Sequence, residues 1–237
     1  MTESSRCPHA EPFAVRGERF FAAEILDLLA PHLTEKRAQR IRDIVAQRTY
    51  SVVPVLEGLY DLGNVNAVLR SAEALGCQVA HVIELTAKYK KANRVSKGAD
   101  KWLDIQRWDA TEPCVAHLRG QGYRIVATHA QRGRPIADAA FDRPIALFFG
   151  NEHAGVSETL LDTADDRVRL PMLGFTGSYN ISAAAAIALY HVFRDRERRL
   201  GRHSDLSAAE MVRLTAVYYR RSIERADDIL WLSRQPT

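Results

Sequence analysis

Three short segments of the sequence combine glycine with amide, hydroxyl or charged side chains, which are groups that contact polar ligands. They are LGNVNAVLRSAEALG (62–76), FFGNEHAG (148–155) and LPMLGFTGSYNISAAAA (170–186). The second segment begins in an apolar, strand-like run, and the third follows one. Open α/β sheets bind ligands at the carboxyl ends of their strands. The third segment continues into an alanine-rich helix, and its start at Gly177–Asn180 is more polar and glycine-rich than a core helix needs.

The first segment has the pattern of an amphipathic helix. Its apolar residues recur at helical spacing and predict a buried stripe of Val65, Val68, Leu69, Ala72 and Leu75. Arg70 falls on the opposite face, and Asn64 lies near the start of the helix. Arg70 is therefore expected to project away from the core.

The apolar spacing in the rest of the chain predicts an α/β core between helical arms. Short β-rich runs alternate with helical segments from Ser51 onwards, which is typical of a mostly parallel sheet with helices on both faces. Helical spacing in 19–30 and 35–48 predicts an N-terminal arm, and the capping pattern Ser207–Glu210 opens a C-terminal arm helix. The expected domains are an arm over 1–50, a core over 51–200 and an arm over 201–237.

The common nucleotide-binding loops are absent from the sequence. The nearest match to the dinucleotide fingerprint is GQGYRI (120–125), in which the third glycine position holds Ile125. Its two glycines precede a strand instead of following one, which is typical of a turn after a helix. No phosphate-binding loop ending in Lys and Ser or Thr occurs. A nucleotide-like cofactor would therefore bind by other means.

Composition and charge narrow the class of protein. The 237 residues are 46% hydrophobic and 26% charged, the balance of an ordinary globular protein. The first residues lack the apolar core of a signal peptide, and the longest apolar run, 183–190, is too short to span a membrane. We therefore expect a cytoplasmic protein without membrane contact. Three widely spaced cysteines are typical of reduced thiols, and we expect no metal site.

Positive charge is concentrated in one segment of the chain. The net charge is only +4, but residues 88–101 carry six basic side chains against the single acid Asp100. Small polar residues lie between the basic ones, a mixture typical of contact with a nucleic-acid backbone. The predicted contacts are Lys90, Lys91, Arg94 and Lys97. A second basic run, 194–202, contains interleaved acids and is equally consistent with a solvated helix face.

Together and in this order, the three segments resemble the signature motifs of the SpoU family of RNA 2'-O-ribose methyltransferases, part of the SPOUT superfamily. The resemblance covers roughly 51–199. Within the family, RVSKGADKWLDI (94–105) and LPMLGFTGSYNIS (170–182) are most similar to the tRNA guanosine-18 type. The family implies a C-terminal trefoil knot, S-adenosylmethionine as methyl donor, and a homodimer that acts on RNA, here tRNA, and not on DNA.

The resemblance also implies roles for single residues. Carried over by position, the catalytic residues are Arg70, Asn64, Glu152, Ser178 and Asn180. The implied donor-binding residues are Thr128, Gly150, Leu170 and Tyr179. At the last of these positions the family usually has Leu, so the tyrosine changes the pocket wall.

Arg70 is a poor general base, because holding a guanidinium neutral near pH 7 costs on the order of 9 kcal/mol. We expect it to bind the substrate phosphate and to stabilise the developing oxyanion. Two alternatives remain open at this level: an enzyme of the same superfamily that acts on rRNA or on a base, and a catalytically silent RNA-binding protein. The intact Asn64, Arg70, Glu152 and Asn180 argue against the silent protein.

Overall fold

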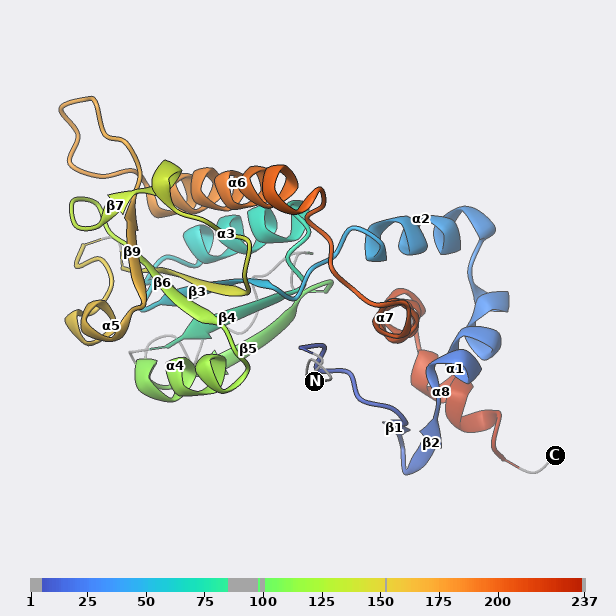
Figure 1. The fold of residues 1–237 in the computed structure, drawn as a ribbon. Coiled ribbons are helices and arrows are strands. Elements are labelled where there is room, and N and C mark those ends of the chain that lie inside the picture. Colours follow the sequence, from blue (N-terminus) through green and yellow to red (C-terminus); the bar gives the residue numbers. More distant parts are fainter. Residues whose placement is uncertain (1–5, 85–97, 99–100, 152, 236–237) are drawn as a thin grey trace. The chain divides into compact units, whose positions relative to one another are not determined.

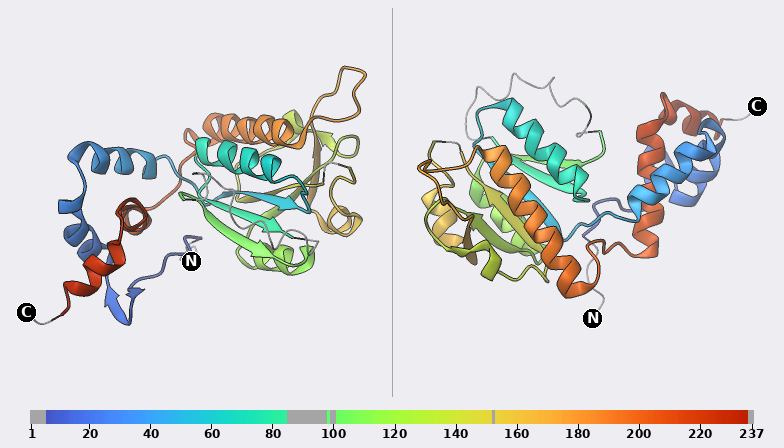
Figure 2. Two further views of the ribbon diagram at one scale, coloured as in Figure 1. Left: turned by 180° about the vertical axis from the view of Figure 1, so that it is seen from behind. Right: turned by 90° about the horizontal axis from the view of Figure 1, so that it is seen from above.

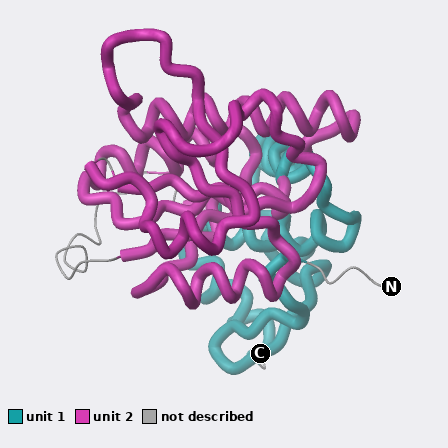
Figure 3. The backbone as a smooth tube through the Cα atoms, turned by 60° about the vertical axis from the view of Figure 1, so that its left-hand side comes forward, with its two compact units in different colours: residues 1–48, 204–237 teal, residues 49–203 magenta. Residues whose placement is uncertain are grey.

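The computed structural model describes residues 6–84, 98, 101–151 and 153–235. The chain forms two compact units (Figure 3). The larger unit contains residues 49–203, and the smaller unit joins the two ends of the chain, residues 1–48 and 204–237.

The larger unit is built on a seven-stranded sheet in the order β5-β4-β3-β8-β6-β9-β7. All neighbouring pairs are parallel. The strands are β3 (Val52–Glu57), β4 (Val79–Ile83), β5 (Asp104–Trp108), β6 (Arg124–Thr128), β7 (Arg134–Pro135), β8 (Ile145–Phe149) and β9 (Asp166–Arg169). The central strands β3 and β8 are buried at every residue, as expected where helices cover both faces.

Helices lie on both faces of this sheet (Figures 1 and 2). On one face, α3 (Leu62–Ala74) and α6 (Ile181–Leu200) pack side by side, and α4 (Thr111–Gly120) covers the other face. A further short helix, α5 (Glu158–Thr163), precedes β9. The predicted α/β class with a parallel sheet is thus confirmed. The buried residues of α3 are Val65, Val68, Leu69 and Ala72, four of the five predicted from the sequence; the fifth, Leu75, caps the end of the helix and is only partly buried.

The smaller unit is helical apart from an antiparallel hairpin of β1 (Phe13–Val15) and β2 (Glu18–Phe20). Its helices are α1 (Ala22–Leu29), a 3-10 turn (Ala30–His32), α2 (Glu35–Val45), α7 (Ala208–Ser222) and α8 (Ala226–Leu232). α7 packs against α1 and α2. The predicted capping pattern is present: the Ser207 hydroxyl accepts from the Glu210 amide, and the Glu210 carboxylate accepts from the Ser207 amide.

Two expectations for the arms are wrong. The first helix begins at Ala22 instead of residue 19, because Glu18–Phe20 pairs with β1. The C-terminal arm is two helices instead of one, since Ile223 is extended and Arg225 is left-handed with a φ of 58°. A local ion pair accompanies this break, in which the Arg225 guanidinium donates to Asp228 at 2.8 Å.

Candidate active site

A cavity of about 370 Å³ lies at the carboxyl ends of β6, β8 and β9. This is the size of many small-molecule sites and the edge at which open α/β sheets bind ligands. The strand ends, the turn before α6 and the first turns of α6 all contribute to its lining. Among the lining residues are Thr128, His129, Ile136, Phe149, Gly150, Asn151, Val168, Leu170, Ser178, Tyr179, Ile181, Ala184 and Ala188.

All four residues that the family resemblance assigned to the methyl donor line this cavity: Thr128, Gly150, Leu170 and Tyr179. The Thr128 hydroxyl donates to the Phe148 carbonyl oxygen at 2.8 Å, so its side chain is fixed against the neighbouring strand. Gly150 is required by the packing of the backbone, because a Cβ there would lie 2.0 Å from the amide nitrogen of Val156.

Tyr179 closes the base of the loop between β9 and α6. Its hydroxyl donates to the Pro171 carbonyl oxygen at 3.0 Å, a bond that a leucine at this position could not make. At the far end of the loop, Leu173 and Phe175 are fully exposed. The departure from the family pattern therefore adds a polar contact across a loop that lines the cavity.

Asn180 connects the edge of the cavity to α3. Its Oδ1 accepts the backbone N–H of Ser182 at 2.9 Å and caps α6. The remaining atom, Nδ2, is therefore a donor, and it lies 3.2 Å from Oδ1 of Asn64. Two predicted catalytic residues that are 116 positions apart are thus in direct contact.

The other predicted catalytic residues differ in position. Ser178 lines the cavity. Arg70 is exposed on α3, as expected, but it does not line the cavity, and within the described part of the chain it forms no hydrogen bond or ion pair. Glu152 and the predicted RNA contacts lie outside the described residues; those contacts are Lys90, Lys91, Arg94 and Lys97.

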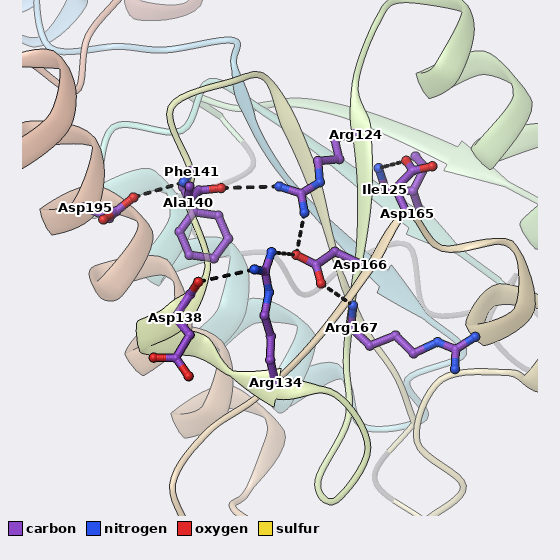
Figure 4. Close-up of polar contacts among 10 residues, drawn as sticks. All are labelled: Arg124, Ile125, Arg134, Asp138, Ala140, Phe141, Asp165, Asp166, Arg167 and Asp195. Carbon is purple, nitrogen blue, oxygen red and sulfur yellow. Dashed lines mark hydrogen bonds and ion pairs between the residues drawn. The ribbon is translucent and has the colours of Figure 1, made fainter.

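A network of charged side chains around Asp166 links β6, β7 and β9 (Figure 4). Asp166 accepts from Arg124 of β6 at 2.5 Å and also from Arg134 of β7. Arg124 and Arg134 donate in turn to the carbonyl oxygens of Ala140 and Asp138, at 3.4 and 3.3 Å. The Asp166 side chain is only 12% exposed. The network therefore ties three strands to the segment that follows β7.

The segment between β7 and β8 is also bound to α6, through Phe141. Asp195 of α6 accepts the backbone N–H of Phe141 at 2.9 Å (Figure 4). Burial alone would raise the pKa of Asp195, but this amide and the guanidinium groups of Arg198 and Arg199 hold it below its ordinary value. Ile136, which lines the cavity, thus lies between two fixed points of the chain: Arg134, which pairs with Asp166, and Phe141, whose amide donates to Asp195.

His129 lines the cavity but was not among the predicted site residues. Its Nδ1 accepts the backbone N–H groups of Gln131 and Arg132, at 3.0 and 2.9 Å, so the ring proton is on Nε2. Burial and the charge of Arg132 lower the pKa of His129, whereas Glu158 raises it. The feature of the sequence that could have identified His129 is its position directly after Thr128, the last residue of a predicted strand.

Comparison with known proteins decides the family. Residues 51–190, more than half of the chain, match the model of the SpoU rRNA methylase family. The chain belongs to this family. All three motif segments fall largely within the matched residues, so the resemblance inferred from them is confirmed.

Several relatives of this SpoU family member are known. A tRNA (guanosine(18)-2'-O)-methyltransferase from Borreliella burgdorferi is 32% identical over 200 residues, which are 84% of this chain and 91% of that protein. The solved structure of the A. aeolicus TrmH/SpoU tRNA modifying enzyme has a TM-score of 0.71 at 26% identity, covering 81% of this chain and 98% of that one. An AdoMet-bound rRNA methyltransferase from Sinorhizobium meliloti has a TM-score of 0.56 at 28% identity, covering 65% of this chain and 59% of that one.

Two further observations concern the described residues of this SpoU chain. They contain no group of three or more side chains that could hold a metal ion. None of their helices combines the length and the hydropathy needed to cross a bilayer.

Proposed function

We propose that this protein transfers a methyl group from S-adenosylmethionine to the 2'-hydroxyl of guanosine 18 in the D-loop of tRNA. The observation that carries the proposal is the 3.2 Å hydrogen bond between Asn180 and Asn64 beside the cavity. This bond joins the first motif segment, 62–76, to the third, 170–186. The second segment, 148–155, forms part of the wall of the adjacent cavity. Contact between residues so distant in sequence supports a single catalytic site.

The cavity suits S-adenosylmethionine in size and lining. Ile136, Phe149 and Val168 offer apolar contact for a purine ring, and two 2.9 Å hydrogen bonds between Asn151 and Gly155 fix a turn of polar backbone groups beside them. The residues that would hold the donor are Thr128, Gly150, Leu170 and Tyr179. When bound, the donor supplies an electrophilic methyl group, so the protein has to align the acceptor oxygen and assist loss of its proton.

The acceptor side is formed by residues of α3 and of the turn before α6. Asn64 and Asn180 orient the ribose through their amide groups, Ser178 lines the cavity beside them, and Glu152 is assigned to the site by the family resemblance alone. The exposed Arg70 guanidinium binds the substrate phosphate and stabilises negative charge on the 2'-oxygen. The same positive charge makes the 2'-hydroxyl easier to deprotonate, and the released proton passes to solvent water as the oxygen takes the methyl group.

Guanosine 18 of tRNA is favoured as the target by the relatives. A protein of that named activity is 32% identical across 91% of its own length, and a solved tRNA modifying enzyme aligns over 98% of its chain. The six basic residues in the sequence 88–101 add positive charge suited to binding a folded RNA. Methylation of rRNA or of a base is the alternative that the experiment below separates.

We also propose a C-terminal trefoil knot and a cytoplasmic homodimer. In support of the knot, the chain leaves the sheet after β9 and returns through α6 to pack against α3. The Asp166 network holds β6 and β7 against β9, so that the segment between β6 and β8 forms a loop. In the proposed knot, the C-terminal part of the chain passes through this loop. The dimer is supported by the family membership.

The experiment uses two tRNA transcripts that differ in one atom. One carries guanosine at position 18, and its matched control carries 2'-deoxyguanosine there. With labelled donor, the protein should methylate the first transcript and leave the second unlabelled. Equal label on both transcripts would reject guanosine 18. Ribosomal RNA is offered in a parallel reaction, and label there with none on either tRNA would favour the rRNA alternative.

A further inference from the structure

Tyr60 is an exposed aromatic residue just beyond the carboxyl end of β3, and the mechanism above does not use it. Its side chain is 60% exposed, whereas the preceding Leu59 is 3% exposed. Within the described residues its phenol forms no hydrogen bond or ring contact. Single exposed apolar residues are common on protein surfaces, so the surroundings of Tyr60 have to decide whether it has a role.

The backbone before Tyr60 is fixed against the cavity wall. Gly58 donates its N–H to the Ile83 carbonyl oxygen at 3.0 Å, and its own carbonyl accepts from Nδ2 of Asn151 at 2.8 Å. Asn151 lines the cavity. The φ of Gly58 is 65°, in the left-handed region that favours glycine, so the chain turns sharply at this point.

The backbone after Tyr60 is fixed against the catalytic helix. The Asp61 side chain caps α3 by accepting the N–H of Gly63 at 2.6 Å, and the Asp61 carbonyl accepts from Val65 at 3.1 Å. One residue past Gly63, Asn64 contacts Asn180. Tyr60 is therefore held between a cavity residue and the Asn64–Asn180 pair, with its ring left in solvent.

We propose that Tyr60 binds the target nucleotide by stacking its ring on the nucleobase. The proposal rests on the proposed function, since it requires a ribose at Asn64 and Asn180. Presenting a 2'-hydroxyl at the Asn64–Asn180 pair beside the cavity requires the nucleotide to leave its stack in the RNA. An aromatic side chain next to the ribose site replaces the lost base stacking, and it does so for any base because every base has a π-face.

The other exposed apolar side chains near the cavity are less suited to this role. Leu173 and Phe175 are more exposed than Tyr60. However, a Cβ at the neighbouring Gly174 or Gly177 would meet nothing within 4 Å, so this part of the loop lacks close packing. Binding of a base to an aromatic side chain costs less conformational entropy when the backbone that carries the side chain is already fixed, as it is at Tyr60.

The test compares Tyr60→Ala and Tyr60→Phe with the control Phe21→Ala, which removes a side chain of similar exposure, 57%, from the other unit. Methylation kinetics are measured on a tRNA transcript, and donor binding is measured by calorimetry. Tyr60→Ala should lower kcat/KM for RNA by roughly ten-fold to a hundred-fold, because stacking on an aromatic residue is lost. Tyr60→Phe and Phe21→Ala should stay within about two-fold of the parent protein, and donor affinity should not change.

A binding measurement that needs no turnover separates this proposal from the proposed function. A transcript with 2-aminopurine at position 18 should lose fluorescence on binding the parent protein and Tyr60→Phe, and much less on binding Tyr60→Ala. Equal quenching by all three proteins would overturn the stacking role, even if methylation occurs. A smaller molecular mass for Tyr60→Ala in solution would also overturn it, because the ring would then pack against a second copy of the chain.

Discussion

Asn180 has two separable functions in this account, and two substitutions should distinguish them. Its Oδ1 caps α6, and its Nδ2 donates to Asn64. Asn180→Asp keeps an oxygen for the Ser182 amide and replaces the donor by an acceptor. Asn180→Ala removes both. The aspartate should therefore lower mainly the activity, whereas the alanine should lower both the activity and the stability.

The size of each effect follows from these contacts. Loss of the cap costs about 1 kcal/mol, and loss of the Asn64 bond costs about 1 kcal/mol more. For a unit of this size, a total of about 2 kcal/mol lowers the melting temperature by roughly 4 to 8 °C in Asn180→Ala. Asp caps helices as well as Asn does, so Asn180→Asp loses only the Asn64 bond, about 1 kcal/mol, and should melt roughly 2 to 4 °C below the parent protein. Both variants should lose on the order of a hundred-fold in kcat, as when one oriented donor is removed from a catalytic site.

Thermal unfolding and single-turnover methylation of a tRNA transcript measure the two quantities independently. Parent-like methylation by Asn180→Asp would show that the Nδ2 donor has no catalytic role. A parent-like melting temperature for Asn180→Ala would contradict the capping contact. Either result would refute the reasoning from this geometry.

Three further predictions concern other parts of the molecule. Arg70→Ala should abolish methylation with donor binding and melting unchanged, and Arg70→Lys should also be poor because an ammonium lacks the guanidinium fork; kinetics and calorimetry measure this. Asp166→Asn should lower the free energy of unfolding by about 1 to 2 kcal/mol. This is less than the cost of breaking a fully buried ion pair, because Arg124 and Arg134 are 31% and 41% exposed. The same substitution should weaken donor binding, which calorimetry measures. Burial, and then the charge of His117, lower the pKa of His81 from 6.5 to about 4. As the pH falls, His81 is protonated in the unfolded chain before it is protonated in the folded chain. The free energy of unfolding should therefore fall by about 3 kcal/mol between pH 7 and pH 4, and by less in His81→Gln. Urea titrations at each pH measure this change.

Local patterns in the sequence were sufficient for much of the fold. The stripe of α3 and the cap of α7 depend on neighbouring residues and were predicted correctly. The donor-binding residues were named by the family resemblance, and they lie together because strand ends meet at one edge of a parallel sheet. β5 was missed, because its residues Asp104–Trp108 are mostly polar and only half-buried at an edge of the sheet.

Contacts between distant residues were beyond local patterns. Family resemblance named Asn64 and Asn180, but nothing in their spacing indicates that they touch across 116 positions. The bond from Tyr179 to Pro171 depends on how the loop folds back, which a single residue type does not reveal. The left-handed Arg225 has no glycine or proline beside it to mark the break between α7 and α8.

The most direct test of the central claim is nucleoside mass spectrometry of tRNA treated with the protein and a donor carrying a deuterated methyl group. The account predicts deuterated 2'-O-methylguanosine from position 18, and none when Arg70→Ala replaces the parent protein. Deuterium on a base, or no deuterium in any RNA offered at saturating donor, would contradict it.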